Sequence, residues 1–226
     1  MADYAPCEKC EDILGKTRQI VGPVLIWLLV AAVIGALTDV PPWSADLFET
    51  MAVEPWVGIG QFLSSVVMIA LILVYLGMLL KTWIAKDHKP FIRLIFGAVA
   101  TTVAYGVNLL LKSDFGMIRP CHDFATGGAC PAIDNFSYPS NHTVIAFGLA
   151  MGLAFAIPWL TYLAFPLAIL AGVSRVMAGH HYPHDIVVGA VLGTLGVLGA
   201  LLMFVKVQDS LAEKLTESRQ KTPEKA

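Results

Sequence analysis

The chain has 226 residues, of which 57% are hydrophobic and only 14% are charged, with a formal net charge of −2 and a mean hydropathy of +0.70. About half of a soluble domain is apolar and about a quarter is charged, so this composition excludes an ordinary soluble domain. The chain is predicted to be an integral membrane protein, with no room left for a second, soluble domain.

The N-terminal segment, residues 1–19, is polar and mixed in charge. Its Cys7 and Cys10 are spaced as half of a zinc site, and no second such pair accompanies them. Incidental cytosolic thiols are the favoured interpretation, with metal or redox chemistry as the alternative. The uncharged run Ile20–Leu37 that follows is too long and too deep in the chain for a removed signal peptide, and is predicted to be the first membrane span.

The stretch Asp39–Pro55 is acidic and is flanked by tryptophans at or near its ends. Its residues Leu47, Phe48 and Met51 are placed to share one side of a short helix lying in the membrane interface. A plain connecting loop remains the alternative.

Two further spans are predicted at Val57–Leu80 and Leu94–Leu111, joined by the short basic connection Lys81–Arg93. The third span ends directly on Lys112. Helical periodicity places Tyr105 and Asn108 on the same face as Lys112, and we expect that face to point into the helix bundle.

Residues 143–174 contain no acid, lysine, arginine or histidine. As one helix they would measure about 48 Å, too long for one crossing of a roughly 30 Å core and short for two. Counted from 140 to 178 the reach becomes about 58 Å, enough for two spans that meet in a tight turn around 157–159. The polar clusters at both ends must then form the outer ends of these helices.

The last span is predicted at Ile186–Val205, and the polar tail 206–226 is expected to be solvated and frayed, with one or two helical turns at most. The fold class is therefore an all-α bundle of six transmembrane helices. We divide the chain into a cytoplasmic N-terminal segment (1–19), a six-span membrane domain (20–205) and a cytoplasmic tail (206–226).

The distribution of basic residues predicts the orientation in the membrane. With six spans, twelve of the fifteen lysines and arginines fall on the side of the two termini, and basic residues are retained on the cytoplasmic side. Both termini are therefore predicted to be cytoplasmic. The three exceptions, and every histidine other than His88, lie on the outer side; the exceptions are Lys112, Arg119 and Arg175. Cys121 and Cys130 also lie outside, in an oxidising compartment, where a disulfide would stiffen the approach to the site.

The three outer cations, together with Ser140 and a turn at Asn141, are suited to hold a multiply charged oxyanion. Arginine offers a planar fork to paired oxygens, and lysine acts as a point charge. Phosphate is the expected guest. Snorkelling to the interface explains an isolated lysine, but it does not explain three cations on one sparsely basic face.

Histidines beside these cations suggest chemistry as well as binding. Pro183 suits the first turn of a helix, which places Asp185 in that turn and His181 just before it. A carboxylate that holds one imidazole nitrogen leaves the other as a nucleophile, and His142 is positioned to protonate the leaving oxygen and later activate water. His180 and His184 as metal ligands are the disfavoured alternative, because no known hydrolytic zinc pattern is present.

Three ordered motifs carry a family resemblance: K-x6-R-P over 112–120, P-S-N-H over 139–142 and S-R-x5-H-x3-D over 174–185. They resemble the signatures of the type-2 phosphatidic acid phosphatase superfamily, which includes bacterial acid phosphatases and vanadium haloperoxidases. The resemblance implies a metal-independent phosphatase without a cofactor, in which His181 forms a phosphohistidine. It also implies that Asp185 orients His181, that His142 is the acid and base, and that five groups hold the phosphate: Lys112, Arg119, Ser140, the amide of Asn141, and Arg175.

One position departs from that pattern, since the second motif usually has glycine where this chain has Asn141. Asparagine tolerates left-handed backbone conformations, so its amide is still expected to reach the phosphate, while its side chain narrows the pocket or adds a donor.

The predicted function is a lipid phosphatase in the bacterial inner membrane, acting on the extracytoplasmic leaflet. A polyprenyl pyrophosphate is the favoured substrate, and phosphatidic acid or phosphatidylglycerol phosphate follows. The expected partners are the lipid substrate and the bilayer, with no nucleic acid and no metal. A haloperoxidase is disfavoured because the soluble helical body of those enzymes is missing. A transporter or scaffold for anionic lipid is the alternative of another class, but it would give His181 and Asp185 no role.

Overall fold

The structure is a computed structural model, and it describes residues 8–220, apart from a few side chains near the two ends of that range. Every regular element within this range is helical, as predicted. The long elements are α1 (Glu8–Ala36), α3 (Trp56–Ile84), α4 (His88–Phe115), α6 (Asn141–Ala156), α7 (Thr161–Met177), and the continuous run of α8 (Pro183–Val191), the π-helical turn η2 (Leu192–Gly196) and α9 (Val197–Met203). The remaining ones are α2 (Pro42–Met51), α5 (Pro120–Asp123), the 3-10 turn η1 (Pro158–Leu160) and α10 (Val205–Gln220).

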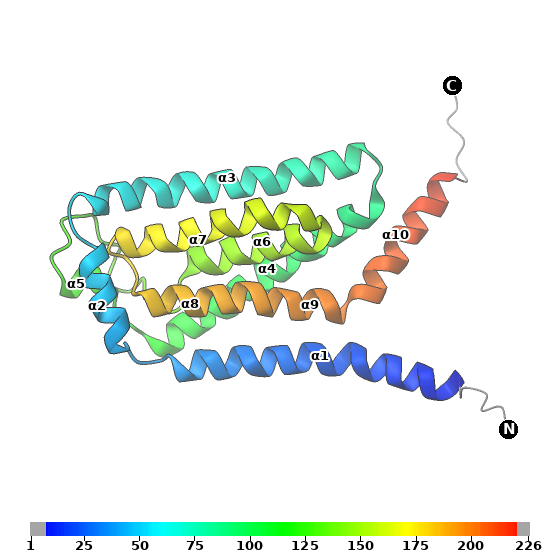
Figure 1. The fold of residues 1–226 in the computed structure, drawn as a ribbon, viewed down its shortest axis with the longest axis horizontal. Coiled ribbons are helices and arrows are strands. Elements are labelled where there is room, and N and C mark those ends of the chain that lie inside the picture. Colours follow the sequence, from blue (N-terminus) through cyan, green and yellow to red (C-terminus); the bar gives the residue numbers. More distant parts are fainter. Residues whose placement is uncertain (1–7, 221–226) are drawn as a thin grey trace.

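The long helices run side by side along one axis (Figure 1). Helices α2 and α5 and the loops around them gather at one end of the bundle, here called the α2 end. Helix α10 and the beginning of α1 lie at the opposite end, here called the α10 end.

Among the described residues, five stretches are long and apolar enough to cross a membrane: Gln19–Ala36, Trp56–Ile84, His88–Asp123, Pro158–Met177 and Pro183–Met203. The remaining predicted span, the fourth in chain order, corresponds to α6, which has 16 residues and measures about 24 Å, less than the roughly 30 Å of a hydrocarbon core. The chain is thus a multi-helix membrane protein, and its sixth crossing stays a prediction.

Helix α6 lies at the centre of the bundle. Its Leu153 packs in a core with Leu71 of α3 and Ala168 of α7, and its Val144 packs in a second core with Val188 of α8. Small residues allow this close packing: a Cβ added at Gly97 of α4 would lie 2.9 Å from the Cα of Gly152, so only glycine lets the two backbones approach this closely. The predicted turn between two antiparallel helices is confirmed, because α6 ends at Ala156 and α7 begins at Thr161.

The first predicted span agrees with the apolar stretch Gln19–Ala36, which is part of a helix that begins at Glu8. The prediction for the C-terminal end needs correction, because residues 205–220 form a helix instead of a frayed tail. Tertiary contacts explain this difference, since Gln208 is buried and Asp209 forms an ion pair with Lys89 of α4 at 3.2 Å. Cys7 and the side chain of Cys10 lie outside the described residues.

The acidic stretch before α3 forms a helix, α2, so the alternative of a plain loop was wrong. Pro42 begins this helix, consistent with its preset φ. The ring of Phe48 is buried against Tyr182, with ring centroids 5.1 Å apart, whereas Leu47 is exposed. Helix α2 is therefore fastened to the chain that precedes α8.

Candidate active site

The residues of the three motifs meet at the α2 end of the bundle, although they come from four different helices and a loop. Most lie within one turn of a helix end, because each motif interrupts an apolar stretch. Lys112 and Arg175 lie in the last turns of α4 and α7. Arg119, Ser140 and His181 lie just before α5, α6 and α8, and Asp185 lies in the first turn of α8.

His181 and Asp185 are joined as predicted at the start of α8. The Nδ1 atom of His181 lies 3.2 Å from Oδ2 of Asp185, and the backbone N–H of Tyr182 donates to the same oxygen at 3.0 Å. Nη1 of Arg119 lies 2.8 Å from Nε2 of His181. Because a guanidinium only donates, Nε2 accepts, and the ring hydrogen is on Nδ1, facing the carboxylate. His181 thus presents an unprotonated Nε2 on its far side.

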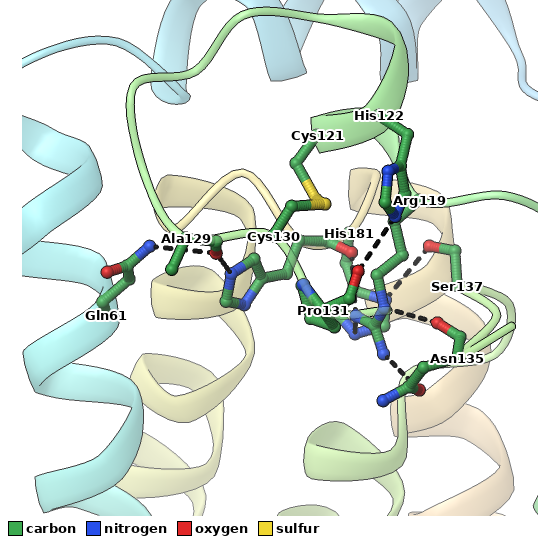
Figure 2. The surroundings of a disulfide bond; sticks show 11 residues. Gln61, Arg119, Cys121, His122, Ala129, Cys130, Pro131, Asn135, Ser137 and His181 are labelled. Carbon is green, nitrogen blue, oxygen red and sulfur yellow. Dashed lines mark hydrogen bonds between the residues drawn. A yellow bond between two sulfur atoms is a disulfide. The ribbon is translucent and has the colours of Figure 1, made fainter. Parts of the chain in front are cut away.

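The guanidinium of Arg119 is held in place by neutral oxygens. Its Nε and Nη2 donate to the carbonyl and side-chain oxygens of Asn135 at 2.6 and 2.9 Å, and Nη1 donates to the carbonyl of His180 at 3.0 Å. Figure 2 shows Arg119 lying between Asn135 and His181. Asn135 was not identified from the sequence, where it is one of several polar loop residues.

The predicted disulfide between Cys121 and Cys130 is confirmed, with their Cα atoms 5.8 Å apart. The loop that it closes is fastened to the site: the carbonyl of Ala129 accepts from Nε2 of His180 at 2.8 Å and from Gln61 at 3.4 Å (Figure 2). The disulfide therefore joins the chain just after Arg119 to the segment whose Ala129 contacts His180, the residue before His181.

Lys112 reaches the site through the loop before α6. Its Nζ donates to the carbonyls of Phe136 and Ser137, the latter at 2.9 Å. The hydroxyl of Ser137 donates to Oδ2 of Asp185 and its oxygen lies 3.2 Å from Nδ1 of His181. Ser137 is thus part of the His181–Asp185 arrangement, and only its place two residues before Pro139 could have signalled this.

Arg175 is oriented by α3 and by the turn that follows α7. Its Nη1 donates to the hydroxyl of Ser64 at 3.0 Å, and its carbonyl accepts from the backbone N–H of His180 at 3.1 Å. Gly179 makes this turn possible because its φ is +76°, a left-handed conformation that favours glycine. Ser64 lies mid-helix in an apolar span, so a polar residue there was the available but unused signal.

The start of α6 is joined to the start of α8, since the N–H of Ser140 donates to the carbonyl of Asp185 at 3.2 Å. The Ser140 side chain caps no backbone amide of α6, and the N-terminus of a helix attracts anions. His142, the second residue of α6, is half-buried.

The left-handed backbone conformation considered for Asn141 is not present. Among described residues other than glycine, only Lys86 has a positive φ, so Asn141 has an ordinary backbone conformation. Its Oδ1 accepts from Nδ2 of Asn108 on α4 at 2.6 Å, so the side chain is engaged with α4. Asn108 is fully buried, which confirms the predicted inward face of that helix.

Positive charge converges on the ring of His181. Burial lowers its pKa well below the usual value, and the charges of Arg119, Arg175 and Lys112 lower it further. The ring is consequently neutral at neutral pH, which is the protonation state that a nucleophile requires.

Other polar residues near the site have contacts of their own. His122, Asp123 and Asp134 are exposed, as predicted for loop surface. His184 contacts the hydroxyl of Ser44, with Nδ1 and Oγ 2.9 Å apart. Within the described part of the chain, no three histidine, cysteine or acidic side chains are arranged to hold a metal ion.

Comparison with known proteins finds similar bacterial proteins, several of them named as phosphatases. The chain is similar to the bacitracin transport permease protein BcrC of Bacillus licheniformis, with 30% identity over 60% of this chain and 70% of that protein. Undecaprenyl-diphosphatase BcrC of Bacillus subtilis is 23% identical over 65% of this chain and 81% of its own length. Lipid A 1-phosphatase of Rhizobium etli is 36% identical over 51% of this chain, and the chain spans only 53% of that protein.

A solved structure shows the same fold. It is a transmembrane PAP2-type phosphatidylglycerolphosphate phosphatase from Bacillus subtilis, with a TM-score of 0.54 and 23% identity over 85% of this chain and 96% of that one. The model of the PAP2 superfamily matches residues 92–209, about half of the chain and all three motifs. The chain therefore belongs to the PAP2 superfamily.

Proposed function

We propose that this PAP2 phosphatase hydrolyses a polyprenyl pyrophosphate lipid, with its site on the exterior side of a bacterial inner membrane. One observation carries the proposal: Nε2 of His181 carries no hydrogen and faces Arg119 at 2.8 Å, while Nδ1 is held by Asp185. A phosphate that displaces the bond to Arg119 would meet both the nucleophilic nitrogen and the cation that neutralises its oxygens.

The charge of the site supports a phosphate guest. Lys112, Arg119 and Arg175 are each less than one tenth exposed, and their hydrogen bonds within the described residues go to neutral oxygens and a neutral ring. Buried charge is costly unless an opposite charge compensates it. An entering phosphate would supply that charge, and phosphoryl transfer depends mostly on such positioning and neutralisation.

The surroundings of the site support a lipid substrate. Large apolar side chains are exposed on α2, on the start of α3 and on the loop around α5, and they include Trp43, Leu47, Trp56, Ile118 and Phe124. Exposed indole rings of this kind are typical of the membrane–water interface. A headgroup can then enter the site while its chain stays in the bilayer.

The proposed reaction has two steps. In the first, the lone pair of His181 Nε2 forms a bond to phosphorus, the bridging P–O bond breaks, and His142 gives its proton to the leaving lipid phosphate. In the second, His142 takes a proton from water, the water oxygen attacks the phosphohistidine, and the P–N bond breaks to release phosphate. Asp185 keeps the proton on Nδ1 throughout, and Lys112, Arg119, Ser140, the amide of Asn141 and Arg175 hold the phosphate oxygens.

The preference for a polyprenyl pyrophosphate rests on the similarity to undecaprenyl-diphosphatase over most of that protein's length. Similarity to phosphatases named for lipid A and for phosphatidylglycerol phosphate makes these lipids the alternatives. A transporter or scaffold would not need the His181–Asp185 arrangement.

The test measures phosphate release by purified protein in detergent, in the presence of EDTA. The substrates are a polyprenyl pyrophosphate, phosphatidic acid, phosphatidylglycerol phosphate and lipid A. We expect the highest kcat/KM with the pyrophosphate, inhibition by vanadate, and a fall of about a thousandfold or more in His181→Ala. His122→Ala, an exposed histidine on the neighbouring loop, is the matched control.

Each part of the proposal has its own contradicting result. Undiminished hydrolysis by His181→Ala would remove the phosphohistidine step, and strict dependence on added metal would reject the mechanism. A tenfold preference for another lipid of the panel would replace the substrate and leave the mechanism in place.

A further inference from the structure

The two carboxylate oxygens of Asp185 have unlike surroundings. Oδ2 is contacted by Nδ1 of His181, by the hydroxyl of Ser137 and by the backbone N–H of Tyr182. Oδ1 is fully buried without a well-aligned hydrogen bond among the described residues, and the polar atom that faces it is Nε2 of His184, 3.3 Å away. A second imidazole thus lies against the carboxylate that orients the first.

The contacts of His184 determine which of its nitrogens carries the hydrogen. The hydroxyl oxygen of Ser44 accepts from the backbone N–H of His184 at 3.1 Å, so its own hydrogen is free to point to Nδ1, 2.9 Å away. Nδ1 then accepts, and the hydrogen of the neutral ring lies on Nε2, which is 3.3 Å from Oδ1 of Asp185 and, like that oxygen, has no well-aligned hydrogen bond among the described residues.

The ring of His184 packs against two tyrosine rings. It stacks on Tyr138 and on Tyr182, with centroids 5.7 Å apart and an interplanar angle of 28° in each pair. Ser44, which holds its edge, is fully buried in the first turn of α2, and Phe48 packs α2 onto Tyr182. Helix α2 therefore reaches the catalytic carboxylate through one serine and one histidine.

We propose that His184 is a positioning residue for the phosphatase reaction: its Nε2–H holds Oδ1 of Asp185, so that Oδ2 stays aligned with His181, and Ser44 of α2 fixes the ring that does so. The inference rests on the proposed function, because it assigns a role within that reaction. The inference also links α2 to the reaction, since a shift of α2 would change the orientation of the Asp185 carboxylate.

The test compares variants that remove or keep the donor. We expect His184→Leu to lower kcat about ten- to a hundredfold, as expected for the loss of a hydrogen bond to a charged group, with KM little changed. His184→Gln, which keeps an N–H near the same position, should restore kcat to within about threefold. Ser44→Ala should lower kcat less than His184→Leu does. In the His184→Leu background it should cause no further decrease in kcat, because the two residues act in series. Ser44→Thr keeps the hydroxyl and is the matched control, with kcat close to that of the wild type.

Several outcomes would overturn the inference. If His184→Gln is as impaired as His184→Leu, or if KM rises while kcat holds, the ring serves packing and not donation. If His184→Leu does not fold, Ser44→Ala alone decides, and an unchanged kcat in that variant rejects the role. Failure of the proposed function is distinct, because it would appear as activity in His181→Ala, whereas failure of this inference leaves that variant inactive.

Discussion

The cations at the two ends of the bundle differ in their partners. At the α10 end, Lys89 and Arg93 are partly exposed and both pair with the carboxylate of Asp209, at 3.2 and 3.4 Å. At the α2 end, the cations of the motifs are buried and donate to carbonyls, hydroxyls and a neutral imidazole. The cations of the first arrangement are thus paired with a carboxylate of the protein, while those of the second form the site that we propose for the phosphate of the substrate.

The largest effect that this comparison predicts concerns arginine replaced by lysine at each end. Arg119→Lys removes the planar fork that joins Asn135 to His181, and we expect kcat/KM to fall about 10²- to 10³-fold. Arg93→Lys keeps a partly exposed charge beside Asp209, far from the site at the α2 end, and kcat/KM should change less than about threefold. Phosphate release from the preferred lipid measures both.

Melting temperatures of both variants show whether either substitution unfolds the protein. Equal reductions of kcat/KM in Arg119→Lys and Arg93→Lys would contradict the comparison. The cations at both ends would then affect activity through the stability of the protein and not through anion binding.

The sequence predicted the local parts of this site well. Pro183 predicts a helix start, which places His181 and Asp185 four residues apart around one turn, and the structure has this arrangement. The interruption of apolar stretches by charged clusters predicts that the cations lie at helix ends, because hydrocarbon excludes them from the middle.

The contacts that join distant segments could not be predicted. Ser44 and His184 are 140 residues apart, and no periodicity relates them. The prediction for residues 205–220 failed for the same reason. The polar sequence of this helix has little apolar periodicity, and the ion pair of Asp209 holds the helix against α4. The contact of Asn141 with Asn108 could not be predicted either, because Asn108 lies on another helix and the motif alone does not reveal it.

The second prediction concerns the disulfide, which closes a loop at the α2 end. Cys121→Ser/Cys130→Ser should lower the free energy of unfolding by about 2 to 3 kcal/mol, the value expected for a loop of about ten residues. Thermal unfolding in detergent, with and without a thiol reductant, measures this. Reduction should bring the wild type to the melting temperature of the variant and should leave the variant unchanged. Equal melting temperatures under both conditions would show that the bond contributes nothing.

The smallest expected effect is the response of stability to acid. Burial, followed by the charge of Arg175, lowers the pKa of His180 to about 4, whereas a histidine in an unfolded chain titrates near 6.5. Below pH 6.5 the unfolded chain binds protons that the folded protein excludes. The free energy of unfolding therefore falls as the pH decreases, until the pH passes below the folded pKa.

The contribution of His180 to this acid sensitivity can be isolated. It amounts to about 2 kcal/mol between pH 7.5 and pH 5. His180→Gln keeps a donor for the carbonyl of Ala129 but does not titrate, so its melting temperature should fall less than that of the wild type over this range. His88→Gln is the matched substitution at the α10 end. If both variants reduce the acid sensitivity equally, the effect does not distinguish the two ends of the bundle. If neither variant reduces it, the buried ring of His180 accepts a proton without loss of stability, and the two ends do not differ in their histidines.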